Sequence, residues 1–175
     1  MKTLLLLRHA KAEPSQTNFD DFERALAPSG REAAPRIGTW LAINGHLPGR
    51  ALVSTARRAQ ETWDLAAAAM PEETAETRGR ELYLASPGDI LAFVGEHAGD
   101  AGSVVVVGHN PGIETLARLL TGPGSNESAA TDLARGMPTA GLAVIECACD
   151  SWADVATAPA RLTAFVRPHD LADAD

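Results

Sequence analysis

Four consecutive leucines near the start of the chain run directly into an arginine and a histidine, so that residues 3–9 read TLLLLRH. A continuous apolar run is typical of a strand buried on both faces, as in a parallel sheet. A guanidinium or imidazole group is costly to bury without a partner. The feature therefore predicts a central strand that ends by delivering Arg8 and His9 to a polar environment.

Further strand-like and helix-like segments alternate along the chain. The other predicted strands are Arg50–Ser54, Ser103–His109, Gly141–Ala148, Ala160–Pro168 and a weaker candidate at Ala75–Leu82. The predicted helices are Ser29–Gly45, Arg57–Pro71, Ser86–Gly99 and Pro111–Gly122, with Ser29 as a possible N-cap of the first. This order predicts an α/β fold, a three-layer sandwich whose mostly parallel central sheet is flanked by helices.

The length of 175 residues suits one domain spanning residues 1–175. Residues 122–140 form a polar stretch that we expect to be a long and mobile connection. The acidic tail, residues 169–175, is expected to fray. Cys147 and Cys149 are too close for a good disulfide and are expected to be ordinary thiols.

The charge of the chain limits its partners. The net charge is −8 and no basic run occurs, which argues against general binding to nucleic acid or to a membrane surface. No segment has the roughly 18 apolar residues of a transmembrane helix, and no signal-peptide pattern is present. We therefore expect a cytoplasmic protein.

Chemically active residues follow three of the predicted strands. The first strand ends in Arg8 and His9, the second ends in Ser54 and leads to TARRAQET, and the third ends in GHNPG with His109. Because open α/β sheets bind ligands at the carboxyl ends of their strands, we expect these side chains to meet. Several cationic groups at one point need an anion, and a phosphoryl group matches the planar fork of arginine. The residues alone thus indicate a phosphate site.

The first of these segments resembles a known family. LLLLRHAKAE is similar to the Arg-His signature of the histidine phosphatase superfamily, which has the phosphoglycerate mutase-like fold. Ala10 stands where many members have glycine, and this RHA version is typical of the small branch that resembles SixA, the phosphohistidine phosphatase.

Three further segments resemble the same branch in the same order. STARRAQETW assigns the second phosphate arginine to Arg58, with Arg57 as the competitor, and VVVVGHNPGIE assigns the second histidine to His109. ERALAPSGREAA resembles the segment after the first motif, in which Arg24 matches and Ala27 departs from the usual serine or threonine. The resemblance covers roughly residues 2–120, and the ordered set is far more specific than RHA alone.

The resemblance implies a mechanism that the residue types can support. His9 would attack phosphorus as a neutral nucleophile and form a phosphohistidine, which water then hydrolyses. Arg8, Arg58 and His109 would hold the phosphoryl oxygens and stabilise the transition state, with His109 expected to be cationic. No cofactor and no metal are needed, because the arginines supply the positive charge. Glu81 is the nearest candidate by chain order for the general acid that many members use.

Some roles stay open at this point. Arg24 is expected to hold the loop after the first strand. Ser54 and Thr55 could donate to phosphate or cap a helix, and Asn110 could face the pocket or cap the helix that follows. Other phosphatase motifs, such as Cys-x5-Arg, Asp-x-Asp after the first strand and the P-loop, do not occur in the chain.

The predicted function is a metal-independent phosphatase acting through a phosphohistidine intermediate, on phosphohistidine of a protein such as a phosphotransfer domain. The alternative is a phosphatase of small phosphorylated metabolites, and a phosphate-binding module without turnover is a third possibility. A mutase would need a lid for which the chain has little room. We therefore expect a shallow and open site.

Overall fold

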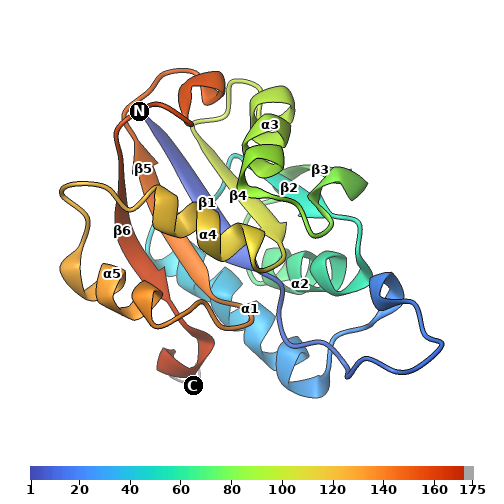
Figure 1. Ribbon diagram of the computed structural model, residues 1–175. Coiled ribbons are helices and arrows are strands. Elements are labelled where there is room, and N and C mark those ends of the chain that lie inside the picture. The colour runs from blue at the N-terminus through green and yellow to red at the C-terminus, as the bar shows by residue number, and fades with distance from the viewer. Residues whose placement is uncertain (172–175) are drawn as a thin grey trace.

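The computed structural model describes residues 1–171 as one six-stranded sheet between two layers of helices (Figure 1). The strands are β1 (Lys2–Arg8), β2 (Arg50–Ser54), β3 (Ala75–Gly79), β4 (Ser103–Gly108), β5 (Leu142–Cys147) and β6 (Ala160–Val166). The helices are α1 (Pro28–Ile43), α2 (Arg57–Ala68), α3 (Pro87–His97), α4 (Gly112–Leu119) and α5 (Glu127–Ala134). The end of the acidic tail, residues 172–175, lies outside the described residues.

The sheet has the strand order β3-β2-β4-β1-β5-β6, so the leucine strand β1 lies near its centre. Strand β1 pairs in parallel with β4, β4 with β2 and β2 with β3, whereas β5 pairs antiparallel with both β1 and β6. The predicted α/β class and mostly parallel sheet are therefore confirmed. The parallel β1–β4 pairing brings the carboxyl ends of these two strands together at one edge.

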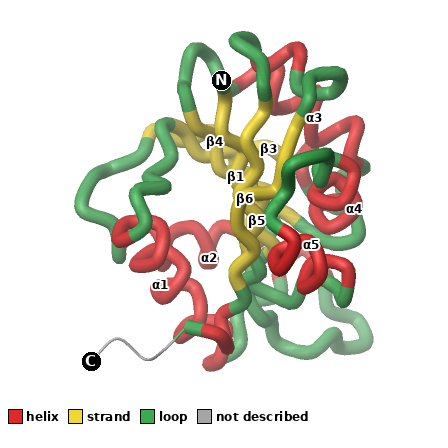
Figure 2. Tube along the Cα trace, turned by 90° about the vertical axis from the view of Figure 1, so that its left-hand side faces the viewer, coloured by secondary structure: helices red, strands yellow, loops and turns green. Residues whose placement is uncertain are grey.

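The leucine run is divided between two cores. Leu4 and Leu6 pack in the cluster that includes residues of α3, α4 and α5, whereas Leu5 and Leu7 pack in the cluster that includes residues of α1 and α2. Figure 2 shows the sheet nearly edge-on, with α1 and α2 on one side and α3, α4 and α5 on the other. Alternate side chains of a strand point to opposite faces, so a continuous apolar run is what a doubly covered strand requires.

The structure corrects two expectations about helices. Residues 122–140 are not simply a long loop, because they contain α5, whose N-cap Asn126 accepts a hydrogen bond from the backbone N–H of Ala129. Helix α1 begins at Pro28 rather than after Ser29, and its capping residue is Ala27. None of the helices within residues 1–171 is long and apolar enough to cross a membrane.

Candidate active site

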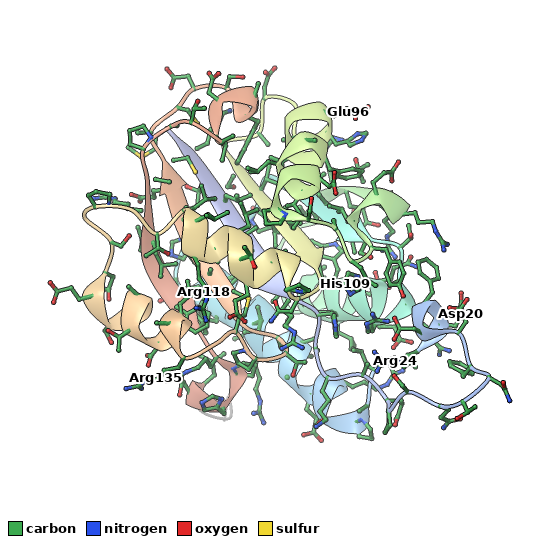
Figure 3. All side chains as sticks on the ribbon, viewed as in Figure 1. Asp20, Arg24, Glu96, His109, Arg118 and Arg135 are labelled. Carbon is green, nitrogen blue, oxygen red and sulfur yellow. The ribbon has the colours of Figure 1, made fainter. Side chains whose placement is uncertain are left out.

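The ends of β1 and β4 place two histidines side by side. Arg8 pairs with Gly108 in the sheet, so His9 and His109 each follow directly, and their ring centroids lie 5.1 Å apart. Figure 3 shows His109 at this edge of the sheet, on the side from which the loop bearing Asp20 and Arg24 extends. Chain order and strand pairing thus bring the two imidazoles together, as the sequence predicts.

Both histidines line an open cavity of about 540 Å³. Its other lining residues come from several segments and are Arg8, Lys11, Ala12, Asp21, Arg24, Arg58, Leu84, Asn110 and Thr139. Four of the five predicted site residues therefore meet in one place. The fifth, Glu81, is exposed on a short 3₁₀ turn and is not among the residues that line the cavity.

The tautomer of His9 is set by its backbone. Its Nδ1 lies 2.7 Å from the carbonyl oxygen of Ala10, and a carbonyl only accepts, so Nδ1 carries the proton. The lone pair is then on Nε2, which accepts a hydrogen bond of 3.3 Å from Nε of Arg58. Burial, followed by repulsion from Arg58 and Arg8, lowers the pKa of His9 to about 4. His9 is therefore a neutral imidazole at neutral pH, with its unprotonated nitrogen, Nε2, beside the Arg58 guanidinium.

Arg58, rather than its neighbour Arg57, belongs to the cavity. Arg58 is buried and directs its guanidinium to His9 and to Asp21, whereas Arg57 is exposed and donates to Glu61 on the helix surface. Both residues lie in the first turn of α2, but they lie on different faces of that turn. The face on which each arginine lies therefore determines that Arg58, and not Arg57, lines the cavity.

His109 is held by Ser54, the last residue of the neighbouring strand β2. Its Nε2 lies 2.8 Å from the hydroxyl oxygen of Ser54, and its Nδ1 is buried with no hydrogen-bond partner among the described residues. Burial, with repulsion from His9 and Arg58, lowers the pKa of His109 to about 3. In the free protein His109 is therefore neutral rather than cationic as expected, because burial and the nearby arginines disfavour a further positive charge.

Arg8 and Asn110 donate hydrogen bonds to the same backbone carbonyl group, that of Met137. Arg8 donates from a terminal nitrogen to the carbonyl oxygen of Met137 at 2.9 Å, and the Asn110 side-chain amide donates to the same oxygen. Asn110 also accepts from the backbone N–H of Glu114, so it caps α4 as well as lining the cavity. Nε of Arg8 is buried with no partner among the described residues.

Asp21 is a cavity residue that the sequence reasoning missed. Its carboxylate accepts hydrogen bonds from Arg58, Arg24 and the hydroxyl of Tyr83. These bonds, that of Tyr83 foremost, lower the pKa of Asp21 to about 2. Asp21 lies three residues before Arg24 and just outside the segment ERALAPSGREAA, and no local sequence pattern marks it as a cavity residue.

Thr62 joins the loop that follows β1 to helix α2. Its buried hydroxyl donates to the carbonyl of Arg58 at 2.6 Å and accepts from the backbone N–H of Ala10 at 2.9 Å. Arg24, as expected, holds the long loop after β1, because it donates to Asp21 and to the carbonyl of Glu13. Through these contacts the backbone beside His9 and the buried Arg58 are held relative to each other.

The cavity has the parts of a phosphoryl-transfer site. It combines an imidazole whose electron pair lies on Nε2 with three arginines, Arg8, Arg24 and Arg58, within one hollow that opens to solvent. Two of its residues, Arg8 and His109, have buried nitrogens without partners among residues 1–171, and such atoms are expected to bind a polar ligand. An anion with several acceptor oxygens fits these donors.

Comparisons with known proteins agree with this geometry. No protein-family model matches the chain. An uncharacterised protein of Mycobacterium leprae is 32% identical over 166 residues, covering 93% of this chain and all of that protein. A solved structure of a candidate phosphohistidine phosphatase SixA from Nakamurella multipartitia is 32% identical with a TM-score of 0.79, covering 95% of this chain and 96% of that one.

A second solved structure, also a candidate phosphohistidine phosphatase SixA, comes from Agrobacterium tumefaciens. It is 29% identical with a TM-score of 0.77, covering 95% of this chain and 99% of that chain. Both likenesses extend over nearly the whole length of the chain. The chain therefore belongs to the histidine phosphatase superfamily, and within it to the SixA-like proteins.

Proposed function

We propose that this protein is a phosphatase that hydrolyses phosphohistidine on a partner protein, with His9 as the nucleophile. The observation that carries this proposal is the absence of a proton donor of carboxylic type among the described residues of the cavity. Asp21 is the carboxyl group that lines the cavity, and its pKa of about 2 keeps it ionised at neutral pH. Glu81 lies outside the lining.

A site without such an acid suits some leaving groups better than others. An alkoxide that leaves a phosphomonoester has a high pKa and needs a proton in the transition state. Phosphohistidine whose second ring nitrogen carries a proton releases a neutral imidazole, which needs none. The cavity therefore favours a phosphoryl group bound to nitrogen.

Two displacements account for turnover with atoms and charges balanced. In the first, the Nε2 electron pair of His9 forms a bond to phosphorus, the phosphorus–nitrogen bond of the substrate breaks, and its electron pair stays on the departing imidazole. In the second, water attacks phosphorus, the bond to Nε2 breaks, and the water proton passes to phosphate or solvent. The proton on Nδ1 of His9, held by Ala10, remains in place, so His9 also leaves as a neutral imidazole.

The phosphoryl oxygens would be held by Arg8, Arg58 and His109, three residues that line the cavity. Among the residues that line the cavity, Arg8 and His109 each have a buried nitrogen, Nε and Nδ1, without a partner in the described part of the chain, and Nε of Arg8 is always protonated. When the hydroxyl of Ser54 donates to Nε2 of His109, the proton of that imidazole lies on Nδ1. Arg58 contributes charge beside the attacking nitrogen.

A substrate comparison tests the proposal. We expect the wild-type protein to release phosphate from a histidine-phosphorylated phosphotransfer domain with a kcat/KM at least about a hundredfold above that for alkyl phosphomonoesters. His9→Ala should lose both activities. Faster turnover of alkyl phosphomonoesters than of the phosphorylated domain would contradict the proposal and favour a small-molecule phosphatase.

A further inference from the structure

The buried arginine of the cavity already has a carboxylate partner. One terminal nitrogen of Arg58 donates to the carbonyl oxygen of Asp21 at 2.7 Å, and the other donates to Oδ2 of the same residue at 3.0 Å. The Arg58 side chain is only 3% exposed, whereas that of Asp21 is 42% exposed. A buried guanidinium without a counter-ion would be costly, so Asp21 stabilises Arg58 in the free protein.

The carboxylate of Asp21 is itself held from two further sides. The hydroxyl of Tyr83 donates to Oδ2 at 2.6 Å, and Nε of Arg24 donates to Oδ1 at 2.8 Å. The ring of Tyr83 packs edge-on against His109, with ring centroids 5.3 Å apart. Three segments, namely the loop after β1, helix α2 and the turn after β3, thus fix one negative charge at the wall of a phosphate cavity.

This negative charge competes with the ligand for the same cation. Nε of Arg58 points at Nε2 of His9, so a phosphorus atom attacked by Nε2 must carry its oxygens next to the Arg58 guanidinium. A phosphate dianion and an ionised carboxylate then share one guanidinium and repel each other. Both cannot gain its full attraction at the same time.

We propose that Asp21 weakens phosphate binding at this site and thereby promotes release of the product. When phosphate departs, the Arg58 guanidinium keeps Asp21 as its counter-ion, so its positive charge is not left buried without a partner. The inference rests on the phosphate site of the proposed function, but not on which phosphorylated compound is the substrate.

The dissociation constant of inorganic phosphate, measured by isothermal titration calorimetry on the full chain, tests this inference. Asp21→Asn removes the charge but keeps an oxygen that can accept from Tyr83, and the Asp21 carbonyl bond to Arg58 is unaffected. We expect this variant to bind phosphate at least about threefold more tightly than wild type, because a repulsive charge near the ligand is lost. An Asp21 that served only to brace its loop would give unchanged or weaker binding.

A second variant changes affinity in the opposite direction. Tyr83→Phe keeps the ring beside His109 but removes the hydroxyl that neutralises part of the Asp21 charge, so phosphate should bind more weakly than to wild type. Asp20→Asn is the matched control, since Asp20 caps the same short turn and its side chain accepts from the backbone N–H of Phe22 rather than from Arg58 or Tyr83. Its affinity should equal that of wild type within twofold.

The outcomes separate two failures. If wild type binds phosphate and Asp21→Asn binds it equally or more weakly, the inference that Asp21 weakens phosphate binding is wrong. The proposed function would not be affected by that result. Tightening by Asp20→Asn as large as that by Asp21→Asn also overturns it, because general charge would then explain the effect. Wild type that binds no phosphate at millimolar concentration contradicts the phosphate site itself.

Discussion

At the scale of single residues, the protonation state and tautomer of His9 depend on the groups that contact its imidazole ring. The carbonyl of Ala10 fixes which ring nitrogen carries the proton, and burial with two nearby guanidiniums keeps the imidazole neutral. Strand ends made Arg8, His9 and His109 predictable, because parallel strands deliver their next residues to one edge. Their neighbours along the loops were harder to foresee.

Asp21 illustrates why. It lies on the loop that follows β1, and its place beside Arg58 follows from long-range hydrogen bonds that no local pattern encodes. Glu81 was expected by chain order alone, but the short turn after β3 leaves it exposed. A residue's position along the chain does not decide whether its side chain turns toward a cavity.

The paired arginines give a direct test at this scale. We predict that Arg58→Gln lowers kcat/KM for phosphate release by at least about a hundredfold, because a preorganised charge beside the attacking nitrogen is lost. Arg57→Gln removes the same charge one residue away and should stay within threefold of wild type. Equal losses in both variants, measured by steady-state phosphate release, would contradict the assignment of Arg58.

At the scale of elements, strand order and helix phase place the site. The apolar runs predicted β1 and β4 as buried strands, and the alternation of strands and helices predicted the sheet between helix layers. Helix α5 was missed because it is only eight residues long and only Ala129 and Leu133 are buried within it. Helix α1 extends to Pro28 because proline is well suited to the first turn.

The link between α2 and the loop that follows β1 can be tested by a matched pair of threonines. Thr62 and Thr131 each donate to the carbonyl oxygen four residues earlier, but only Thr62 also accepts from the backbone N–H of Ala10. We predict that Thr62→Val lowers the free energy of unfolding by about 1–3 kcal/mol, because it leaves a buried N–H unpaired. Denaturant unfolding should show a change below about 0.5 kcal/mol for Thr131→Val.

The same variant should also affect catalysis, since the Thr62 hydroxyl connects Arg58 to the backbone beside His9. We expect the rate of phosphate release to fall at a temperature where the variant is fully folded. If Thr62→Val had the unfolding free energy and the phosphate-release rate of wild type, the hydrogen bond between Thr62 and Ala10 would not position the loop that follows β1.

At the scale of the whole molecule, the two buried histidines link stability to pH. Their folded-state pKa values, about 4 for His9 and about 3 for His109, lie below the ordinary value of 6.5. Below about pH 6.5 and above these folded-state pKa values, the two histidines bind protons in the unfolded chain but not in the folded chain. The free energy of unfolding is therefore highest above about pH 6.5 and decreases as the pH is lowered. The loss should amount to a few kcal/mol by about pH 4.

Chemical denaturation at a series of pH values measures this dependence. We predict that His109→Gln, which removes one titrating imidazole, flattens the fall in unfolding free energy between pH 6.5 and 4. His169→Gln is the control, because that side chain is 66% exposed and should leave the slope unchanged. A slope that is the same in wild type and in His109→Gln would contradict a buried neutral His109.

The central claim is that phosphoryl transfer proceeds through a covalent bond to Nε2 of His9. Rapid quench into alkali, after mixing with a 32P-phosphohistidine phosphotransfer domain, tests it most directly, with peptide mapping of the labelled protein. The account predicts label on His9 within the first turnover, its loss as phosphate appears, and none in His9→Ala. Phosphate release by wild type with no label on His9, or undiminished release by His9→Ala, would contradict the account.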